Sequence, residues 1–564
     1  YYVKIDVPAD WANAEDKKVE EVLPGNNKKL INMVQTIMEP VAKMDGDSLP
    51  VSAFVDHADG TFEQGAAAYE KRGVAVMVPV WDETKCIQCN RCSYVCPHAT
   101  IRPFALSEEE VANAPMEFKT IQAMGKGVEN LKYRIQVTPA NCVGCGLCAV
   151  ECPGKGGNKA LEMVDINEKL DQEPLADYLF KQTEYKTEYF PTDTVKGSQF
   201  LMPYFEVSGS CPGCGETPYY KLVSQLFGKD MLVANATGCS MIYCSSTPST
   251  PFVNDANGEG VAWANSLFED NAEFGYGMAL SQNYKEARIL KAMEDNMENV
   301  EPALKDAFAK YLEVHGDREA ERTIAPTIKE LAAKSDIPAV KELAEVDLVS
   351  KSIWIVGGDG WAYDIGYGGL DHVLANDLNV NVLVLDTEVY SNTGGQSSKS
   401  SQAASIAKFA AGGKTTAKKD LGQIAMAYGH VYVASISMGA NKAQTLKAIK
   451  EAESYDGPSL ILAYSPCAEH GIKGGLANHQ RRQAKAVECG YFVLYRYDPR
   501  KEQPLTINSK ETDYDKMLDF MMTETRYSQL PKLKGETAYE MFEKTKKDAM
   551  KRHKRLLAIA KESM

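Results

Sequence analysis

From about residue 200 onward, short apolar runs alternate with amphipathic segments along the chain. The apolar runs predict strands at 231–237, 352–358, 381–387, 431–437 and 459–465. Helical spacing of apolar residues predicts helices at 363–377 and 440–453, between successive strands. Strands that alternate with helices are typical of a parallel, doubly wound sheet. We therefore predict an α/β domain of this type over residues 201–500.

Other segments show different patterns. A helix is predicted at 27–44, within an N-terminal segment (1–78) that we expect to be α/β or connecting. Charged helical patterns at 284–350 predict an insertion of helices that cover one face of the sheet. The polar, acidic stretch 167–200 predicts a linker that wraps around the protein.

The last segment, 501–564, is predicted as a helical tail. From residue 536 it has the pattern of a basic helix, which we expect to dock on the rest of the chain or to be solvated rather than to grip a partner.

Size and composition limit the choices. At 564 residues the chain is too long for one hydrophobic core, which suggests three or four domains. A net charge of -15 argues against nucleic acid as the main partner. No run of about 18 apolar residues and no signal peptide stand out, so we expect no membrane span and a cytoplasmic location. The chain begins at Tyr1 rather than Met, which suggests a piece of a longer protein.

Cysteine is the residue type that carries most chemical information here. Of 14 cysteines, all but Cys244 and Cys489 occur in Cys-x-x-Cys groups or beside Pro and Gly in loop-like contexts. This is the pattern of metal ligands, which we prefer to disulfides in a reducing compartment. Cys489 follows a helical pattern and is predicted to be a packed thiol.

Two cysteine groups share one spacing, Cys-x2-Cys-x2-Cys-x3-Cys-Pro. In such runs three cysteines bind one [4Fe–4S] cluster, and the fourth reaches across to the other cluster. We therefore predict an α+β, two-cluster ferredoxin-like module over 79–166, inserted ahead of the sheet. The predicted ligands are Cys86, Cys89, Cys92 and Cys152 for the first cluster, and Cys142, Cys145, Cys148 and Cys96 for the second.

Structural zinc is the alternative for these groups. Zinc sites usually combine two Cys-x2-Cys knuckles into four ligands, and two complete four-cysteine runs do not match that habit. His98, two residues after Cys96, is predicted to be an exposed loop residue.

A glycine-rich turn follows the predicted strand 352–358. It reads Gly358-Asp359-Gly360-Trp361, and a second loop, 386–395, follows the next strand. Carboxyl ends of neighbouring parallel strands meet at one edge of a sheet, where glycines allow a diphosphate to approach backbone N–H groups.

This pair of loops resembles the magnesium and thiamine diphosphate motif of thiamine-dependent enzymes. The resemblance implies that the Asp359 carboxylate, the Thr387 hydroxyl and the Val389 carbonyl hold Mg²⁺, together with diphosphate oxygens and water. Thr387, where most of these enzymes have Asn, resembles the 2-oxoacid:ferredoxin oxidoreductases. Further contacts to the cofactor are implied for Gly358, Gly360, Trp361, Tyr390, Ser391 and Asn392.

The remaining cysteine pair lies in CPGCGE, residues 211–216. A zinc knuckle is one interpretation, completed by Cys239 with Cys244 or by Cys239 with Cys467. The set is also similar to the proximal [4Fe–4S] site of the pyruvate:ferredoxin oxidoreductase family. That resemblance implies Cys211, Cys214, Cys239 and Cys467 as ligands, and places Glu216 and Cys239 against the thiamine cofactor.

The order of the modules resembles the C-terminal half of the single-chain members of this family. The resemblance implies oxidative decarboxylation of pyruvate with coenzyme A, giving acetyl-CoA and CO₂. Electrons would pass from thiamine diphosphate through three [4Fe–4S] clusters to ferredoxin or flavodoxin. It also implies a homodimer, a catalytic role for Asn392, and an absent N-terminal half that supplies the carboxylate that activates thiamine.

Two alternatives stay open. The substrate could be another 2-oxoacid, namely 2-oxoglutarate, a branched-chain acid or indolepyruvate. The chain could also be a non-catalytic iron–sulfur electron carrier.

Overall fold

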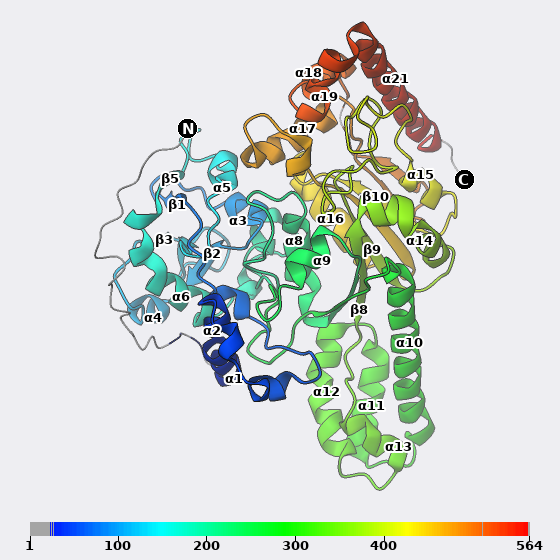
Figure 1. The fold of residues 1–564 in the computed structure, drawn as a ribbon. Helices are drawn as coiled ribbons and strands as arrows, with labels where there is room; N and C mark the ends of the chain where they lie inside the picture. The colour runs from blue at the N-terminus through cyan, green and yellow to red at the C-terminus, as the bar shows by residue number, and fades with distance from the viewer. Residues whose placement is uncertain (1–22, 24, 26, 510, 562–564) are drawn as a thin grey trace.

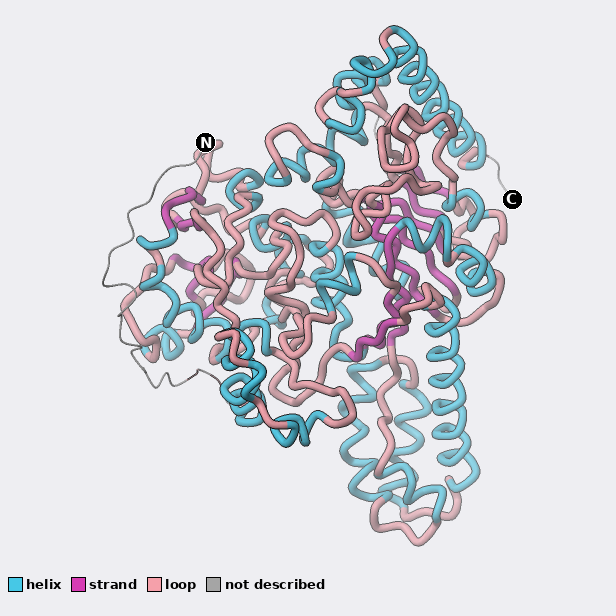
Figure 2. Tube along the Cα trace, in the orientation of Figure 1, coloured by secondary structure: helices cyan, strands magenta, loops and turns pink. Residues whose placement is uncertain are grey.

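The computed structural model describes residues 23, 25, 27–509 and 511–561, and an eight-stranded sheet forms its centre (Figures 1 and 2). The strand order is β13-β12-β10-β11-β9-β8-β6-β7, and the six strands from β10 to β7 are parallel. Their bounds are β6 Met231–Asn235, β7 Ala262–Asn265, β8 Ser352–Gly358, β9 Val380–Asp386, β10 Tyr432–Ile436 and β11 Pro458–Tyr464. The five predicted strands are all present.

Helices cover both faces of the sheet, because successive side chains of a strand point to opposite sides. Val233, Trp354 and Leu383 share one apolar core with α8 (Thr217–Phe227), α9 (Cys239–Cys244) and α16 (Lys442–Glu453). Ile355 and Val384 share another with α10 (Asn271–Asn296), α14 (Tyr367–Leu374) and α15 (Leu421–Met426). This is the doubly wound arrangement that the sequence predicts.

The helical insertion differs from the prediction. Only the first part of α10 covers the sheet. There Gly275 lies against Ile355, and a Cβ added to this glycine would lie 2.3 Å from Ile355 Cγ1. The 26 residues of α10 extend about 39 Å, whereas the seven of β8 extend about 23 Å. The C-terminal part of α10 therefore extends beyond the sheet as a helical arm (Figure 1). This arm has its own apolar core, which α10 forms with α11 (Pro302–Val314), α12 (Arg318–Ala332) and α13 (Pro338–Lys341).

The ferredoxin-like module has two small antiparallel sheets. One pairs β1 (Met77–Trp81) with β5 (Leu161–Asp165), and the other has the order β2-β4-β3 (Ile101–Leu106, Lys132–Val137, Ile121–Gln122). Short helices α3 (Arg91–Val95) and α5 (Leu147–Glu151) each begin inside a cysteine group. The module packs directly on the first face of the large sheet, and the Tyr94 hydroxyl donates to the Lys442 carbonyl at 3.1 Å.

The remaining segments hold these parts together. Residues 27–76 form helical turns, α1 (Lys28–Met33), η2 (Val34–Met38) and α2 (Glu39–Ala42), without a strand in this stretch. The predicted linker contains α6 (Glu173–Lys181), which packs on β2, and α7 (Val195–Ser198).

The C-terminal tail is not helical throughout, because its first element, β13 (Leu505–Ile507), extends the large sheet. It pairs antiparallel with β12 (Tyr495–Tyr497), which in turn pairs antiparallel with β10. Helices α18 (Met517–Met521), α19 (Thr525–Ser528), α20 (Leu530–Lys534) and α21 (Glu536–Ile559) follow. The basic helix α21 docks on the chain through buried Phe542 and Leu556. Across the ranges given above, no helix combines the length and the apolar character needed to cross a bilayer.

Candidate functional site

Four neighbouring parallel strands carry the predicted site residues at one edge of the sheet. In the order β11, β9, β8 and β6, the strands are followed by Cys467, Thr387, Asp359 and Cys239. The register pairs Gly358 of β8 with Leu385 of β9, so Asp359 and Thr387 leave their strands side by side. The structure thus brings together residues from the predicted thiamine motif and from the scattered cysteine group.

Asp359 is the buried centre of the predicted magnesium site. Its Oδ1 accepts from the Thr387 N–H at 3.2 Å and from Thr387 Oγ1 at 2.9 Å, and its Oδ2 accepts from Ser398 Oγ at 2.6 Å. Thr387 Oγ1 also lies 3.0 Å from the Val389 carbonyl oxygen. Burial raises the pKa of Asp359 to about 8, and the nearby Asp386 raises it too. Three convergent oxygens with one carboxylate fit Mg²⁺, which prefers oxygen ligands.

Glu388 holds the loop that presents two of these oxygens. It lies between Thr387 and Val389 with φ 60°, in the left-handed region that non-glycine residues rarely adopt. Its buried carboxylate pairs with Lys418 at 3.3 Å and with Arg526 at 2.9 Å. Burial raises the pKa of Glu388, but the two cations lower it, with a net result of about 2.

Further side chains behind the loop complete this support. The Tyr491 hydroxyl donates to Glu388 Oε2 at 2.5 Å, and His470 Nε2 lies 2.6 Å from the Thr387 carbonyl oxygen. Sequence reasoning missed Ser398, Glu388, Lys418 and Arg526. The local signal was the pair of acidic residues, Asp386 and Glu388, that flank Thr387 where a mostly apolar strand ends.

The glycines and aromatic residues of the two loops fit around each other. A Cβ on Gly360 would lie 2.5 Å from the Tyr390 ring, so a larger residue would displace that side chain. Trp361 is buried, and its indole N–H has no hydrogen-bond partner within the part of the chain that the structure covers. Ser391 Oγ lies 3.3 Å from Cys239 Sγ, and the adjacent Asn392 is exposed.

The eight ferredoxin-type cysteines gather into two sets. One cavity is lined by Cys86, Cys89, Cys92 and Cys152, and a second by Cys96, Cys142, Cys145 and Cys148. Each set contains one cysteine from the other sequence group, which is the crosswise arrangement that the spacing predicts. Burial raises the pKa of the Cys92 thiol, and the charges of Cys89, Cys86 and Cys152 raise it further.

The prediction for His98 was wrong. It is 1% exposed, it lines the second cavity, and its Nε2 lies 3.1 Å from the Ser210 carbonyl oxygen. Burial lowers the pKa of His98 to about 4. The segment that buries it comes from more than 100 residues later in the chain, which local sequence does not reveal.

The third group surrounds a buried carboxylate. Burial raises the pKa of Glu216 to about 7, and its Oε2 has no partner among the residues described. The charge of Glu216 in turn raises the pKa values of Cys214, Cys239 and Cys467, after the larger effect of burial.

Gly215 allows this loop to lie against its neighbours. A Cβ on Gly215 would lie 2.3 Å from the Pro466 carbonyl oxygen, so Gly215 allows the loop of Cys211 and Cys214 to lie against Cys467. Cys244, by contrast, is fully buried in the apolar core. Within the described ranges, no three His, Cys, Asp or Glu side chains are placed to hold a single metal ion, as a zinc knuckle requires.

The three cysteine sets follow one another in space. The carbonyl oxygen of Ser210, the residue before Cys211, lies 3.1 Å from His98 Nε2, and His98 lines the cavity of the second set. Cys148 of the second set lies close enough to Cys92 of the first set for the charge of Cys92 to raise the pKa of Cys148, after the larger effect of burial. The first set lies farthest along this series, and its Cys86 and Cys89 are half-buried.

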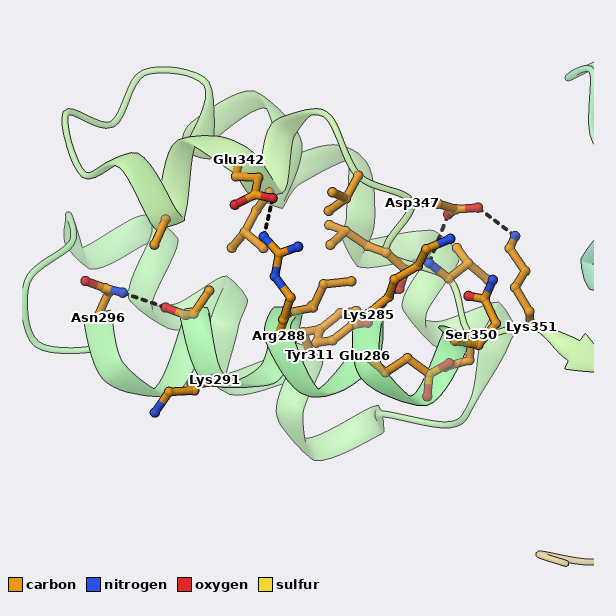
Figure 3. Close-up of a pocket in the computed structure, with 18 of the residues that line it drawn as sticks. Lys285, Glu286, Arg288, Lys291, Asn296, Tyr311, Glu342, Asp347, Ser350 and Lys351 are labelled. Atoms are coloured by element: carbon orange, nitrogen blue, oxygen red, sulfur yellow. Dashed lines mark hydrogen bonds and ion pairs between the residues drawn. The ribbon is translucent and has the colours of Figure 1, made fainter. Parts of the chain in front are cut away.

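A separate cavity of about 620 Å³ lies in the helical arm (Figure 3). Ser350 and Lys351, which line it, precede β8, whereas Asp359 follows that strand, so this cavity belongs to the opposite edge of the sheet. Two ion pairs join residues that line it, Arg288 with Glu342 at 2.5 Å and Lys351 with Asp347 at 2.6 Å. It is not part of the candidate site.

Comparison with known proteins matches the same regions. Residues 339–463 match the thiamine pyrophosphate enzyme, C-terminal TPP binding domain, residues 85–155 match a 4Fe-4S dicluster domain, and residues 18–75 match a domain of unknown function. A pyruvate:ferredoxin oxidoreductase from Moorella thermoacetica is 50% identical over 97% of this chain and 47% of its own length. The chain is a homologue of the pyruvate:ferredoxin (flavodoxin) oxidoreductases.

Other relatives agree with this result. A pyruvate-flavodoxin oxidoreductase from Enterobacter agglomerans is 49% identical over 98% of this chain and 47% of its own length. A mitochondrial pyruvate dehydrogenase (NADP(+)) from Euglena gracilis is 44% identical over 94% of this chain and 29% of its own length. The chain spans about half the length of the first two relatives. The predicted thiamine-binding sheet and the two-cluster module are confirmed.

We predict that single cysteine variants group crosswise. Cys152→Ala and Cys86→Ala should lose the same cluster, whereas Cys96→Ala and Cys142→Ala should lose the other one. Iron and sulfide content together with EPR spectra of the dithionite-reduced protein check this, with Cys489→Ala as a control that keeps every cluster. If the spectrum of Cys152→Ala matched that of Cys142→Ala, the crosswise sets would be wrong.

We also predict that Arg526→Met weakens thiamine diphosphate binding in the presence of magnesium. The variant leaves the buried Glu388 carboxylate with one cation fewer, and breaking a buried pair costs about 3–5 kcal/mol. Calorimetric titration should show a loss in affinity of at least about tenfold, or about 1.4 kcal/mol. Arg500→Met is the control, since Arg500 pairs with Asp498 and not with Glu388. Equal affinities of the two variants would show that Glu388 does not organise the site.

Proposed function

We propose that this chain is the cofactor-binding half of an enzyme that oxidatively decarboxylates pyruvate. The overall reaction joins the acetyl group to coenzyme A, releases CO₂ and passes two electrons singly to ferredoxin or flavodoxin. One observation carries the proposal: the Asp359 site and the third cysteine set share one sheet edge, where Ser391 Oγ lies 3.3 Å from Cys239 Sγ. The names of the homologues support the substrate and the acceptors.

Thiamine diphosphate, when bound, supplies a carbon that adds to a 2-oxo group and accepts its electrons, and [4Fe–4S] clusters accept electrons one at a time. Asp359, Thr387 and the Val389 carbonyl would hold Mg²⁺ for the diphosphate. Gly358 and Gly360 would let the diphosphate approach the backbone. The remaining residues that we assign to the cofactor pocket are Glu216, Cys239, Trp361, Tyr390, Ser391 and Asn392.

Asn392 is the residue that we propose as catalytic. It is exposed on the loop that follows β9, next to Ser391 and so beside the third cysteine set. An amide at this place can donate a hydrogen bond to a 2-oxoacid that arrives from solvent.

The three cysteine sets form the proposed electron route. The third set, Cys211, Cys214, Cys239 and Cys467, would hold the cluster next to thiamine. The contact of Ser210, next to Cys211, with His98 at the second set supports the second cluster as the next carrier, and the proximity of Cys148 to Cys92 supports the first cluster as the last one. The half-buried Cys86 and Cys89 support an outlet to ferredoxin or flavodoxin at that end.

The other half of the enzyme would cover the site edge. Apolar side chains around this edge are exposed, with Phe268 at 85%, Ile365 at 65% and Phe409 at 94%. The upstream half of the relatives is a suitable occupant, and it would bring the carboxylate that activates thiamine, together with contacts to pyruvate and coenzyme A. We further propose a homodimer and a cytoplasmic location, on the basis of the family resemblance alone.

A direct test combines the chain with its upstream half. We predict that pyruvate and coenzyme A reduce ferredoxin only when both halves are present, and that Asp359→Asn abolishes both thiamine diphosphate binding and turnover. Asp377→Asn, an exposed carboxylate beyond α14, is the control. Robust pyruvate-dependent dye reduction by the 564 residues alone would contradict the division of labour. Turnover of 2-oxoglutarate but not of pyruvate would contradict the substrate, and failure to bind thiamine would favour the electron-carrier alternative.

A further inference from the structure

A lysine is buried between the ferredoxin-like module and the large sheet. Lys221 lies in the middle of α8, the helix that starts directly after Glu216, and is 1% exposed. Its Nζ donates to the backbone carbonyls of Ser93 and Tyr94, the latter at 3.3 Å, and to Gln199 Oε1 at 3.3 Å. In Figure 1, α8 lies between α3 and the strands of the large sheet.

All of these partners are neutral. No carboxylate of the described residues lies within 4.0 Å of Lys221 Nζ, although the other buried cations near this interface are paired, Arg102 with Glu206 and Lys442 with Glu151. A buried ammonium without a counter-charge is costly, by several kcal/mol even after relaxation. Burial accordingly lowers the pKa of Lys221 to about 8.

The negative charge that faces Lys221 belongs to the cysteines. Ser93 and Tyr94 lie in α3, between Cys92 of the first set and Cys96 of the second. The charges of both thiols raise the pKa of Lys221, against the effect of burial and of Arg102. A [4Fe–4S] cluster with four thiolate ligands is an anion, and each reduction adds one more negative charge. A cation at this place therefore stabilises the reduced form of both clusters.

We propose that Lys221 is a shared buried counter-charge for the two ferredoxin-type clusters, which raises the reduction potentials of both. It is a positioning residue for charge rather than a catalytic one, because it touches neither substrate nor cluster ligand. This inference rests on the crosswise ligand sets but not on pyruvate as substrate. It can therefore fail or succeed independently of the proposed reaction.

A second lysine provides a matched comparison. The thiol charges of Cys86 and Cys89, both in the first set, raise the pKa of Lys196, although burial lowers it overall. Its side chain is only half-buried, so solvent screens its charge more than that of Lys221. Lys196→Met should lower the potential of the first cluster only, and by a smaller amount. Lys310→Met in the helical arm should change neither potential.

The test is an EPR-monitored redox titration of the cluster-loaded protein without substrate, on Lys221→Met, Lys221→Gln and Lys221→Arg. We expect the neutral variants to lower both midpoint potentials, each reduction equilibrium falling by about tenfold, which is about 59 mV for one electron. Lys221→Arg should keep both potentials near those of the unaltered protein. Unchanged potentials in a neutral variant with full iron and sulfide content would overturn the proposal.

A separate outcome is that the neutral variants do not retain their clusters, so that no potential can be measured. If neither neutral variant holds its clusters, a counter-charge role predicts that Lys221→Arg still does, with potentials near the unaltered values. Loss of clusters in all three variants, Arg included, would contradict the proposal, because charge would then not be the property that the site requires.

Discussion

The left-handed backbone at Glu388 is the constraint on which the proposed cofactor site depends. With φ 60° at this one residue, the Thr387 side chain and the Val389 carbonyl both lie close to Asp359. The conformation is costly for a residue with a side chain, and buried ion pairs to Lys418 and Arg526 hold it in place. Since Arg526 belongs to the C-terminal tail, that tail forms part of the site rather than an appendage.

The parallel sheet explains why the proposed thiamine site and the proposed electron carriers lie together. Strand direction sends Cys239, Asp359, Thr387 and Cys467 to one edge, although they are distributed over more than 200 residues of sequence. Helix α8 then connects this edge to the ferredoxin-like module, with Glu216 at its start and Lys221 in its middle. One short helix thus borders all three cysteine sets, and the two charged groups on it have opposite signs.

Much of this could be predicted from the sequence, where the signals are local. The crosswise cysteine sets follow from their spacing, and the pairing of Asp359 with Thr387 follows from strand alternation. The ion pair of Glu388 with Arg526 joins residues 138 apart, and the contact of Lys221 with Ser93 joins residues 128 apart, so no local pattern indicates either one. The prediction that His98 is exposed was wrong for the same reason. The helices of the arm were expected on the face of the sheet, because a charge pattern indicates a helix but does not show whether the helix extends beyond the sheet.

We assign the proposed magnesium site and the third cysteine set to one edge of the sheet. Mn²⁺ in place of Mg²⁺ tests this most directly, by its EPR spectrum with thiamine diphosphate bound, before and after reduction of the clusters. The structure predicts that reduction broadens the Mn²⁺ signal through a nearby spin, and that Cys467→Ala removes the broadening while Mn²⁺ stays bound. An Mn²⁺ signal that is the same in the oxidised and reduced protein would show that the two sites are not close.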